Sequence, residues 1–140
     1  MMRDVSIPLL HIADATAAAV RKKGLRRPGL IATAFTMEQS FYLDRLVAGG
    51  LEPIVPDAAD RADAHRIIYD ELCRGVTTRE SEARFVDIAA RLVERGADGM
   101  ILGCTEVGML LNQGNVSVPV FDTTLIHCEA ALDFAGVTYD

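Results

Sequence analysis

The stretch Gly99-Met-Ile-Leu-Gly-Cys-Thr-Glu106 decides the fold that we expect for this chain. Its three consecutive apolar residues, Met100 to Leu102, indicate a strand that is buried on both faces, and such strands are typical of parallel sheets. Polar side chains follow at once, and an apolar run typical of a helix comes after them. A buried strand that leads directly into a helix favours an alternating α/β fold.

The same alternation of short apolar runs and longer amphipathic stretches extends outward over the whole chain. Strands are predicted at residues 7–12, 29–33, 52–55, 99–103 and 118–121. Helices are predicted at residues 13–23, 36–48, 60–72, 81–94, 105–111 and 123–134. We therefore predict one α/β domain over residues 1–140, a three-layer α/β/α sandwich around a mostly parallel sheet of about five strands.

Composition excludes several classes of protein. The 140 residues carry 14 lysines and arginines against 20 aspartates and glutamates, a net charge of −6, which argues against a nucleic-acid-binding surface. Half of the residues are hydrophobic, yet no run of about 18 apolar residues indicates a membrane span, and the first residues do not resemble a signal peptide. We expect a cytoplasmic protein with no nucleic-acid or membrane partner.

The three cysteines, Cys73, Cys104 and Cys128, are widely spaced and odd in number, so they predict neither a disulfide framework nor a zinc site. Cys73 and Cys128 fall on predicted helices and are interpreted as packing residues. The histidines have no second ligand at metal-binding spacing, and no glycine-rich nucleotide motif is present. We expect no metal and no cofactor.

Ligands of open parallel sheets bind beyond the carboxyl ends of the strands, which directs attention to Cys104. A cysteine at a helix N-terminus faces free amides that favour a thiolate, and the same amides can receive a carboxylate. Thr105 adds a hydroxyl and Glu106 a carboxylate in the first turn. The alternative is that Cys104 is a small buried residue and that Thr105 and Glu106 only cap the helix.

Two further strand ends carry polar candidates. Thr33 and Thr36 follow the second predicted strand and could bind an anion, or Thr36 could cap the next helix in a capping box with Gln39. His11 closes the first predicted strand, although a lone histidine is usually a hydrogen-bonded structural residue.

Together these junctions resemble one family, the aspartate/glutamate racemases, which are cofactor-independent amino-acid racemases and include hydantoin racemase relatives. The resemblance is carried by residues 7–16, 36–39, 41–42, 55–56, 60–61, 65, 67–72, 102–106, 118–124 and 127. It implies a small amino-acid substrate, such as aspartate or glutamate, and no pyridoxal phosphate or metal.

The resemblance also implies roles for residues. Family members place two thiols, or a thiol and a threonine, on opposite faces of the substrate α-carbon, where one removes the proton and the other returns one. Cys104 matches the second of these acid/base residues, and Thr105 matches a neighbour that helps to hold the α-carboxylate. Further substrate-binding positions are implied at Thr33, Thr36, Glu106 and His11.

Finally, the resemblance implies that the chain corresponds to the second lobe of a two-lobed racemase, with residues 1–25 and 123–140 similar to parts of the first lobe and the crossover. The motif that carries the other acid/base residue has no counterpart here, so we expect an incomplete racemase site. The alternative function is a non-catalytic module that binds an amino acid or another carboxylate. Apolar faces at residues 7–12 and 123–134 would lack a partner, so we expect a homo-oligomer.

Overall fold

The computed structural model describes residues 6–33, 37, 40–126 and 128, with the backbone alone at residues 6–12, 40, 41 and 105. Its elements, in chain order, are α1 Ser6–Lys22, β1 Pro28–Ile31, α3 Ser40–Ala48, α4 Ala58–Asp70, η1 Leu72–Arg74, α5 Arg79–Glu94, β2 Gly99–Leu102, η2 Thr105–Met109 and β3 Val120–Asp122. The two η elements are short 3-10 helices. Within the described part, no helix is both long and apolar enough to cross a membrane.

The three strands form a parallel sheet in the order β1-β2-β3. In its register Ile31 lies opposite Leu102, and Leu102 lies opposite Asp122. The carboxyl ends of all three strands therefore meet at one edge of the sheet, which we call the carboxyl edge. This arrangement confirms the predicted α/β class and its parallel sheet.

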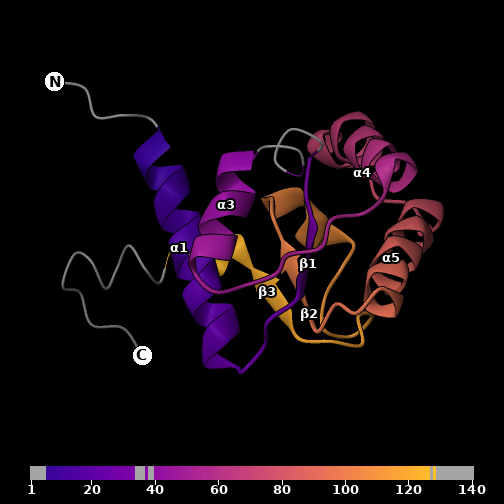
Figure 1. The fold of residues 1–140 in the computed structure, drawn as a ribbon. Helices are drawn as coiled ribbons and strands as arrows, with labels where there is room; N and C mark the ends of the chain where they lie inside the picture. Colours follow the sequence, from indigo (N-terminus) through magenta and orange to yellow (C-terminus); the bar gives the residue numbers. More distant parts are fainter. Residues whose placement is uncertain (1–5, 34–36, 38–39, 127, 129–140) are drawn as a thin grey trace, which may run out of the picture.

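Helices lie on both sides of the sheet, α1 and α3 on one side and α4 and α5 on the other (Figure 1). The strands β1 and β2 are buried along their whole length, as their unbroken apolar sequence predicts. The N-cap of helix α5 is Thr78, whose hydroxyl accepts from the amide of Ser81, and the helix buries Phe85, Ile88 and Leu92. Its apolar stripe at helical spacing therefore covers one face of the sheet.

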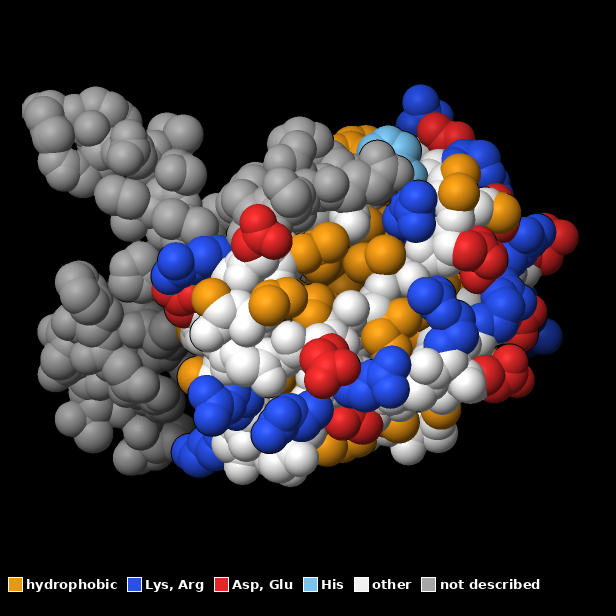
Figure 2. Space-filling model, in the orientation of Figure 1, with side chains coloured by type: hydrophobic (Ala, Val, Ile, Leu, Met, Phe, Trp, Pro, Cys, Tyr) orange, Lys and Arg blue, Asp and Glu red, His pale blue; other side chains and the backbone are white. Residues whose placement is uncertain are grey.

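On the outer side of this layer, α4 and α5 are joined by ion pairs. The guanidinium of Arg91 donates two hydrogen bonds to Asp60, at 2.7 and 2.9 Å, and Arg84 pairs with Asp63. Figure 2 shows basic and acidic side chains interspersed on this part of the molecule. Such largely exposed pairs connect the two helices but add little stability each.

The outer side of β3 is capped by a side chain. In the parallel pair with β2, the amide of Val120 points away from β2, and it donates to Oε1 of Gln113 at 2.9 Å. The Nε2 atom of Gln113 donates in turn to the carbonyls of Val118, at 2.9 Å, and Val116, at 3.4 Å. One glutamine thus satisfies backbone groups that a neighbouring strand would otherwise take.

Two of the predicted strands are wrong. Residues 7–12 belong to α1, because a short, mostly apolar run fits a helix as well as a strand and the alanine-rich segment after it continues the helix. Pro8 lies in the first turn, where its missing amide has no partner to lose. Residues 52–55 contribute only an isolated bridge between Ile54 and Gly29, because Pro53 and Pro56 limit the ladder. The described sheet therefore has three strands instead of about five.

The predicted helices agree with the structure more closely than the predicted strands do. The predicted helices at residues 13–23, 60–72 and 81–94 correspond to α1, α4 and α5, with shifted ends. The predicted helix at residues 105–111 is the 3-10 helix η2, which is five residues long and contains Gly108. The helix predicted at residues 36–48 corresponds to α3, Ser40–Ala48, and to Met37, which is also helical, and residues 123–126 are helical at the start of the last predicted helix. Most of that last helix lies outside the described residues.

Candidate active site

The carboxyl edge is tied together by hydrogen bonds next to Cys104. The amide of Gly103 donates to the carbonyl of Ile31 at 2.8 Å, which joins β2 to β1. The hydroxyl of Thr123 is buried and donates to the carbonyl of Leu102 at 2.8 Å, which joins the end of β3 to β2. The backbone that carries Cys104 is therefore held from both neighbouring strands.

Gly103 permits this close approach. A β-carbon at this position would lie 2.7 Å from the Cβ of Ala32 and 3.1 Å from the Cδ1 of Leu30, both of which are buried. Contacts this short cannot be accommodated without moving the two strand ends apart. Packing therefore favours glycine at the position before Cys104.

Cys104 itself is half-buried, with an extended backbone at φ −146° and ψ 158°, immediately before η2. Burial raises the pKa of its thiol from an ordinary 9.0 to about 11. Backbone hydrogen bonds involving Val107 and Glu106 lower this pKa in part, whereas the charges of Glu106 and of Cys73 raise it further. This direction is opposite to the predicted preference for a thiolate at this helix end, because burial outweighs the few amides of a short 3-10 helix.

Two other predicted site residues, Glu106 and Thr33, also lie close to strand ends at the carboxyl edge. Glu106 is half-buried in the first turn of η2, and Thr33 is half-buried two residues after β1, with its carbonyl accepting from the amide of Met37 at 3.0 Å. Since Ile31 pairs with Leu102, Thr33 and Cys104 follow neighbouring strand ends.

Three predicted site residues lie wholly or partly outside the described part of the chain. Thr105 is the first residue of η2, but its side chain lies outside the described part. Thr36 lies outside the described residues altogether. His11 is in α1 instead of at a strand end, and its side chain is not described.

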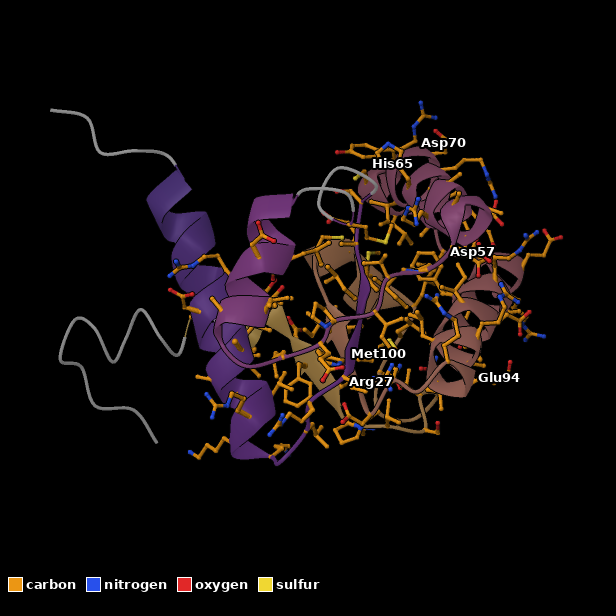
Figure 3. The ribbon with its side chains drawn as sticks, viewed as in Figure 1. Arg27, Asp57, His65, Asp70, Glu94 and Met100 are labelled. Carbon is orange, nitrogen blue, oxygen red and sulfur yellow. The ribbon has the colours of Figure 1, made fainter. Side chains whose placement is uncertain are left out.

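Two further polar residues, which the sequence analysis included in the resemblance but did not assign to the site, also lie toward this end of the sheet. Asp122 ends β3, and its Oδ1 accepts from the amides of Thr124, at 2.9 Å, and Leu125, at 3.3 Å, so it caps the helical turn that follows. His65 lies toward the same end of the molecule on α4 (Figure 3), with its ring centroid 4.7 Å from that of Tyr69. The strand-end position of Asp122 was visible in the sequence, whereas the placement of His65 depends on how α4 packs.

Cys73 and Cys128 are exposed, so their interpretation as packing residues is wrong. Cys73 lies in η1 because α4 ends at Asp70, and a three-residue 3-10 turn leaves its side chain on the surface. Within the described residues, no group of three or more histidine, cysteine, aspartate or glutamate side chains is arranged to hold a metal ion.

Comparison with known proteins decides the family. The model of the family described as Asp/Glu/Hydantoin racemase matches residues 1–131. The chain belongs to the Asp/Glu/hydantoin racemase family. This membership agrees with the position of Cys104 at the carboxyl edge, because the family resemblance rests in part on residues 102–106.

Solved structures with racemase names share the fold. A candidate Asp/Glu racemase from Yersinia pestis is 47% identical with a TM-score of 0.87, over 90% of this chain and 55% of that chain. An aspartate racemase homologue from Pyrococcus horikoshii OT3 is 36% identical with a TM-score of 0.82, over 89% of this chain and 55% of that chain. The aspartate racemase of Picrophilus torridus, at 19% identity and a TM-score of 0.68, is similar in fold over 92% of this chain and 53% of that chain.

A curated relative is shorter than these structures. An uncharacterised protein from the region 3′ of pnlA in Pectobacterium carotovorum subsp. carotovorum is 30% identical over 105 residues, which are 75% of this chain and 69% of that protein. The chain spans about half the length of the solved racemase-family structures that it matches.

Proposed function

We propose that this chain carries one side of a cofactor-independent amino-acid racemase site, in which Cys104 moves the α-proton of aspartate, glutamate or a similar amino acid. The observation that carries the proposal is the half-buried thiol at the carboxyl edge, next to the central strand β2, in a member of the racemase family. Carboxyl ends of parallel strands are where ligands of such sheets bind.

The electrostatics of Cys104 suit proton transfer at carbon. An α-proton is a weak acid, so its removal needs a strong base, and a thiol with a pKa of about 11 becomes a stronger base once ionised than an ordinary thiol. In its resting thiol form the same group can return a proton. Burial therefore has opposite effects, since it makes the thiolate rare but more basic.

In the proposed step, the thiolate of Cys104 takes the α-proton, and the electron pair of the broken C–H bond moves into the carboxylate. Donors around that carboxylate stabilise the charge that develops. We propose that Thr105, Thr33 and Thr36 supply such donors, and that Glu106 and His11 line the same pocket.

A single thiol reaches one face of the α-carbon, which gives the proposal a specific test. We expect the chain in D₂O to exchange the α-proton of one enantiomer of aspartate or glutamate, with retention and without producing the other enantiomer. Proton NMR follows the loss of the α-signal, and chiral chromatography follows inversion. We expect Cys104→Ser to lose the exchange and Cys128→Ser, at an exposed thiol outside the proposed site, to keep it.

The contrary outcomes are also specific. Exchange that persists in Cys104→Ser would rule out Cys104 as the base. Calorimetric binding of either enantiomer with no exchange by the unmodified chain would overturn the proposed chemistry and favour the alternative, a non-catalytic binding module.

We also propose that the chain forms a homo-oligomer through the side of β3. A groove of about 520 Å³ between α1 and β3 is lined in part by Ala19, Phe121 and Ile126, and Leu125 at its rim is 59% exposed. Covering such apolar surface favours self-association. Light scattering after size exclusion is expected to give a multimer for the unmodified chain and a smaller species for Leu125→Asp. A monomer for both would overturn this proposal.

We further propose that the protein works in the cytoplasm. An acid/base thiol must stay reduced, and thiols persist in that compartment. Cell fractionation checks this location, and recovery of the protein from an oxidising compartment would contradict it.

A further inference from the structure

The peptide group between Leu102 and Gly103 is held by hydrogen bonds from two directions. Its carbonyl accepts from the hydroxyl of Thr123 at 2.8 Å, and its amide donates to the carbonyl of Ile31 at 2.8 Å. A peptide group is planar and resists rotation about its C–N bond, so the two bonds fix the orientation of one rigid unit. The next peptide group along the chain leads into Cys104.

The turn after β3 directs Thr123 into the protein. Thr123 is only 5% exposed, whereas Asp122 before it and Thr124 after it are exposed. The Oδ1 atom of Asp122 accepts from the amides of Thr124 and Leu125, which holds the turn in place. The Oδ2 atom of Asp122 lies 3.9 Å from the position that a β-carbon of Gly108 would take, so this turn lies beside η2.

We propose that Thr123 is a positioning residue for Cys104, whose buried hydroxyl acts through the Leu102 peptide group to keep the thiol in its half-buried place at the carboxyl edge. This inference rests on the proposed function, in which Cys104 moves a proton at carbon. Such a group has to lie within hydrogen-bond distance of the proton that it takes, and a small displacement lowers the rate steeply. Because the hydroxyl of Thr123 donates to a backbone carbonyl, Thr123 acts through the backbone.

Two substitutions separate this role from simple space filling. Valine has nearly the shape of threonine but lacks the hydroxyl, whereas serine keeps the hydroxyl and lacks the methyl group. If Thr123 only filled space, Thr123→Val would preserve the site and Thr123→Ser would disturb it. A positioning hydroxyl predicts the reverse order.

The test measures how fast iodoacetamide labels Cys104 of the whole chain between pH 7 and pH 11, by timed quenching and mass spectrometry. Burial holds the thiol pKa at about 11, so a strand end that loosens and admits water lowers that pKa. We expect Thr123→Val to label about threefold faster than the unmodified chain at pH 8, which corresponds to a pKa lower by roughly half a unit. We expect Thr123→Ser to keep the unmodified profile.

The matched control is Leu92→Val, which shortens a buried side chain at the other end of the strands. The Cδ1 atom of Leu92 lies 3.0 Å from the position that a β-carbon of Gly29 would take, near the start of β1. This variant loosens the core away from the carboxyl edge, so its labelling profile at Cys104 is expected to stay unchanged. Circular dichroism under the labelling conditions shows that each variant is folded.

Three outcomes would overturn the proposal: an unchanged profile in Thr123→Val, an equal shift in Thr123→Ser, or an equal shift in Leu92→Val. If Thr123→Val does not fold, the serine variant decides alone, because a shifted profile there contradicts a role for the hydroxyl and an unchanged one supports it. The labelling needs no substrate, so failure of the chain to exchange an α-proton would overturn the proposed function without altering this measurement.

Discussion

At pH 8, Cys104 of the folded protein is expected to react with iodoacetamide about 100-fold more slowly than Cys104 of the urea-unfolded chain. Only the thiolate attacks this reagent, and burial raises the pKa of the thiol from an ordinary 9.0 to about 11, a difference of two units. The rate in the folded protein is expected to rise about tenfold with each pH unit as the pH approaches that pKa. Timed quenching and mass spectrometry of the peptide that contains Cys104 measure both effects.

The same digest contains its own controls. Cys73 and Cys128 are exposed, so their labelling is expected to differ little between folded and unfolded chains. The sign of the pH effect on stability follows from the same raised pKa: the folded state favours the protonated thiol, so this contribution is complete below pH 9 and is lost as the pH rises through about 11. Equal labelling rates for Cys104 in the folded and unfolded chains would contradict the proposed effect of burial.

Replacement of Phe85 by alanine is expected to lower the free energy of unfolding by about 3–5 kcal/mol. Phe85 is fully buried on the inner face of α5, the helix that packs against β1, so its removal loses apolar burial and leaves a cavity. Urea unfolding followed by circular dichroism measures the change.

The matched control is Val47→Ala on α3, where the side chain is 55% exposed and a change of about 0.5 kcal/mol or less is expected. A loss of similar size in both variants would show that Phe85 does not occupy the core. The comparison separates burial from helix propensity, because each variant places alanine within a helix.

The parts of the fold that were predictable are those in which one local pattern dominates. The predicted strands at residues 29–33 and 99–103 begin with uninterrupted apolar residues and correspond to β1 and β2, and the helical spacing around Phe85 identifies α5. Residues 7–12 show the limit of this reasoning. Their apolar run has no periodicity that separates a buried strand from a helix, and the neighbouring alanines decide the outcome in favour of α1.

In the candidate site, too, some features follow from the local sequence and others depend on the surrounding fold. The position of Cys104 at the carboxyl edge follows from the strand before it and from the rule for parallel sheets. The direction of its pKa shift does not, because burial is supplied by the surrounding fold and not by neighbours in the chain.

The side chain of Gln113 has a consequence for how molecules of this protein can meet. By accepting from the amide of Val120 and donating to the carbonyl of Val118, it occupies one outward hydrogen-bonding group of β3 and one of the segment just before that strand. An incoming strand would have to displace the side chain of Gln113 before it could form hydrogen bonds with β3 and extend the sheet. Growth of a continuous intermolecular sheet, the first step toward amyloid-like aggregation, is therefore disfavoured along the outer side of β3. Association of two molecules along this strand has to proceed through side chains.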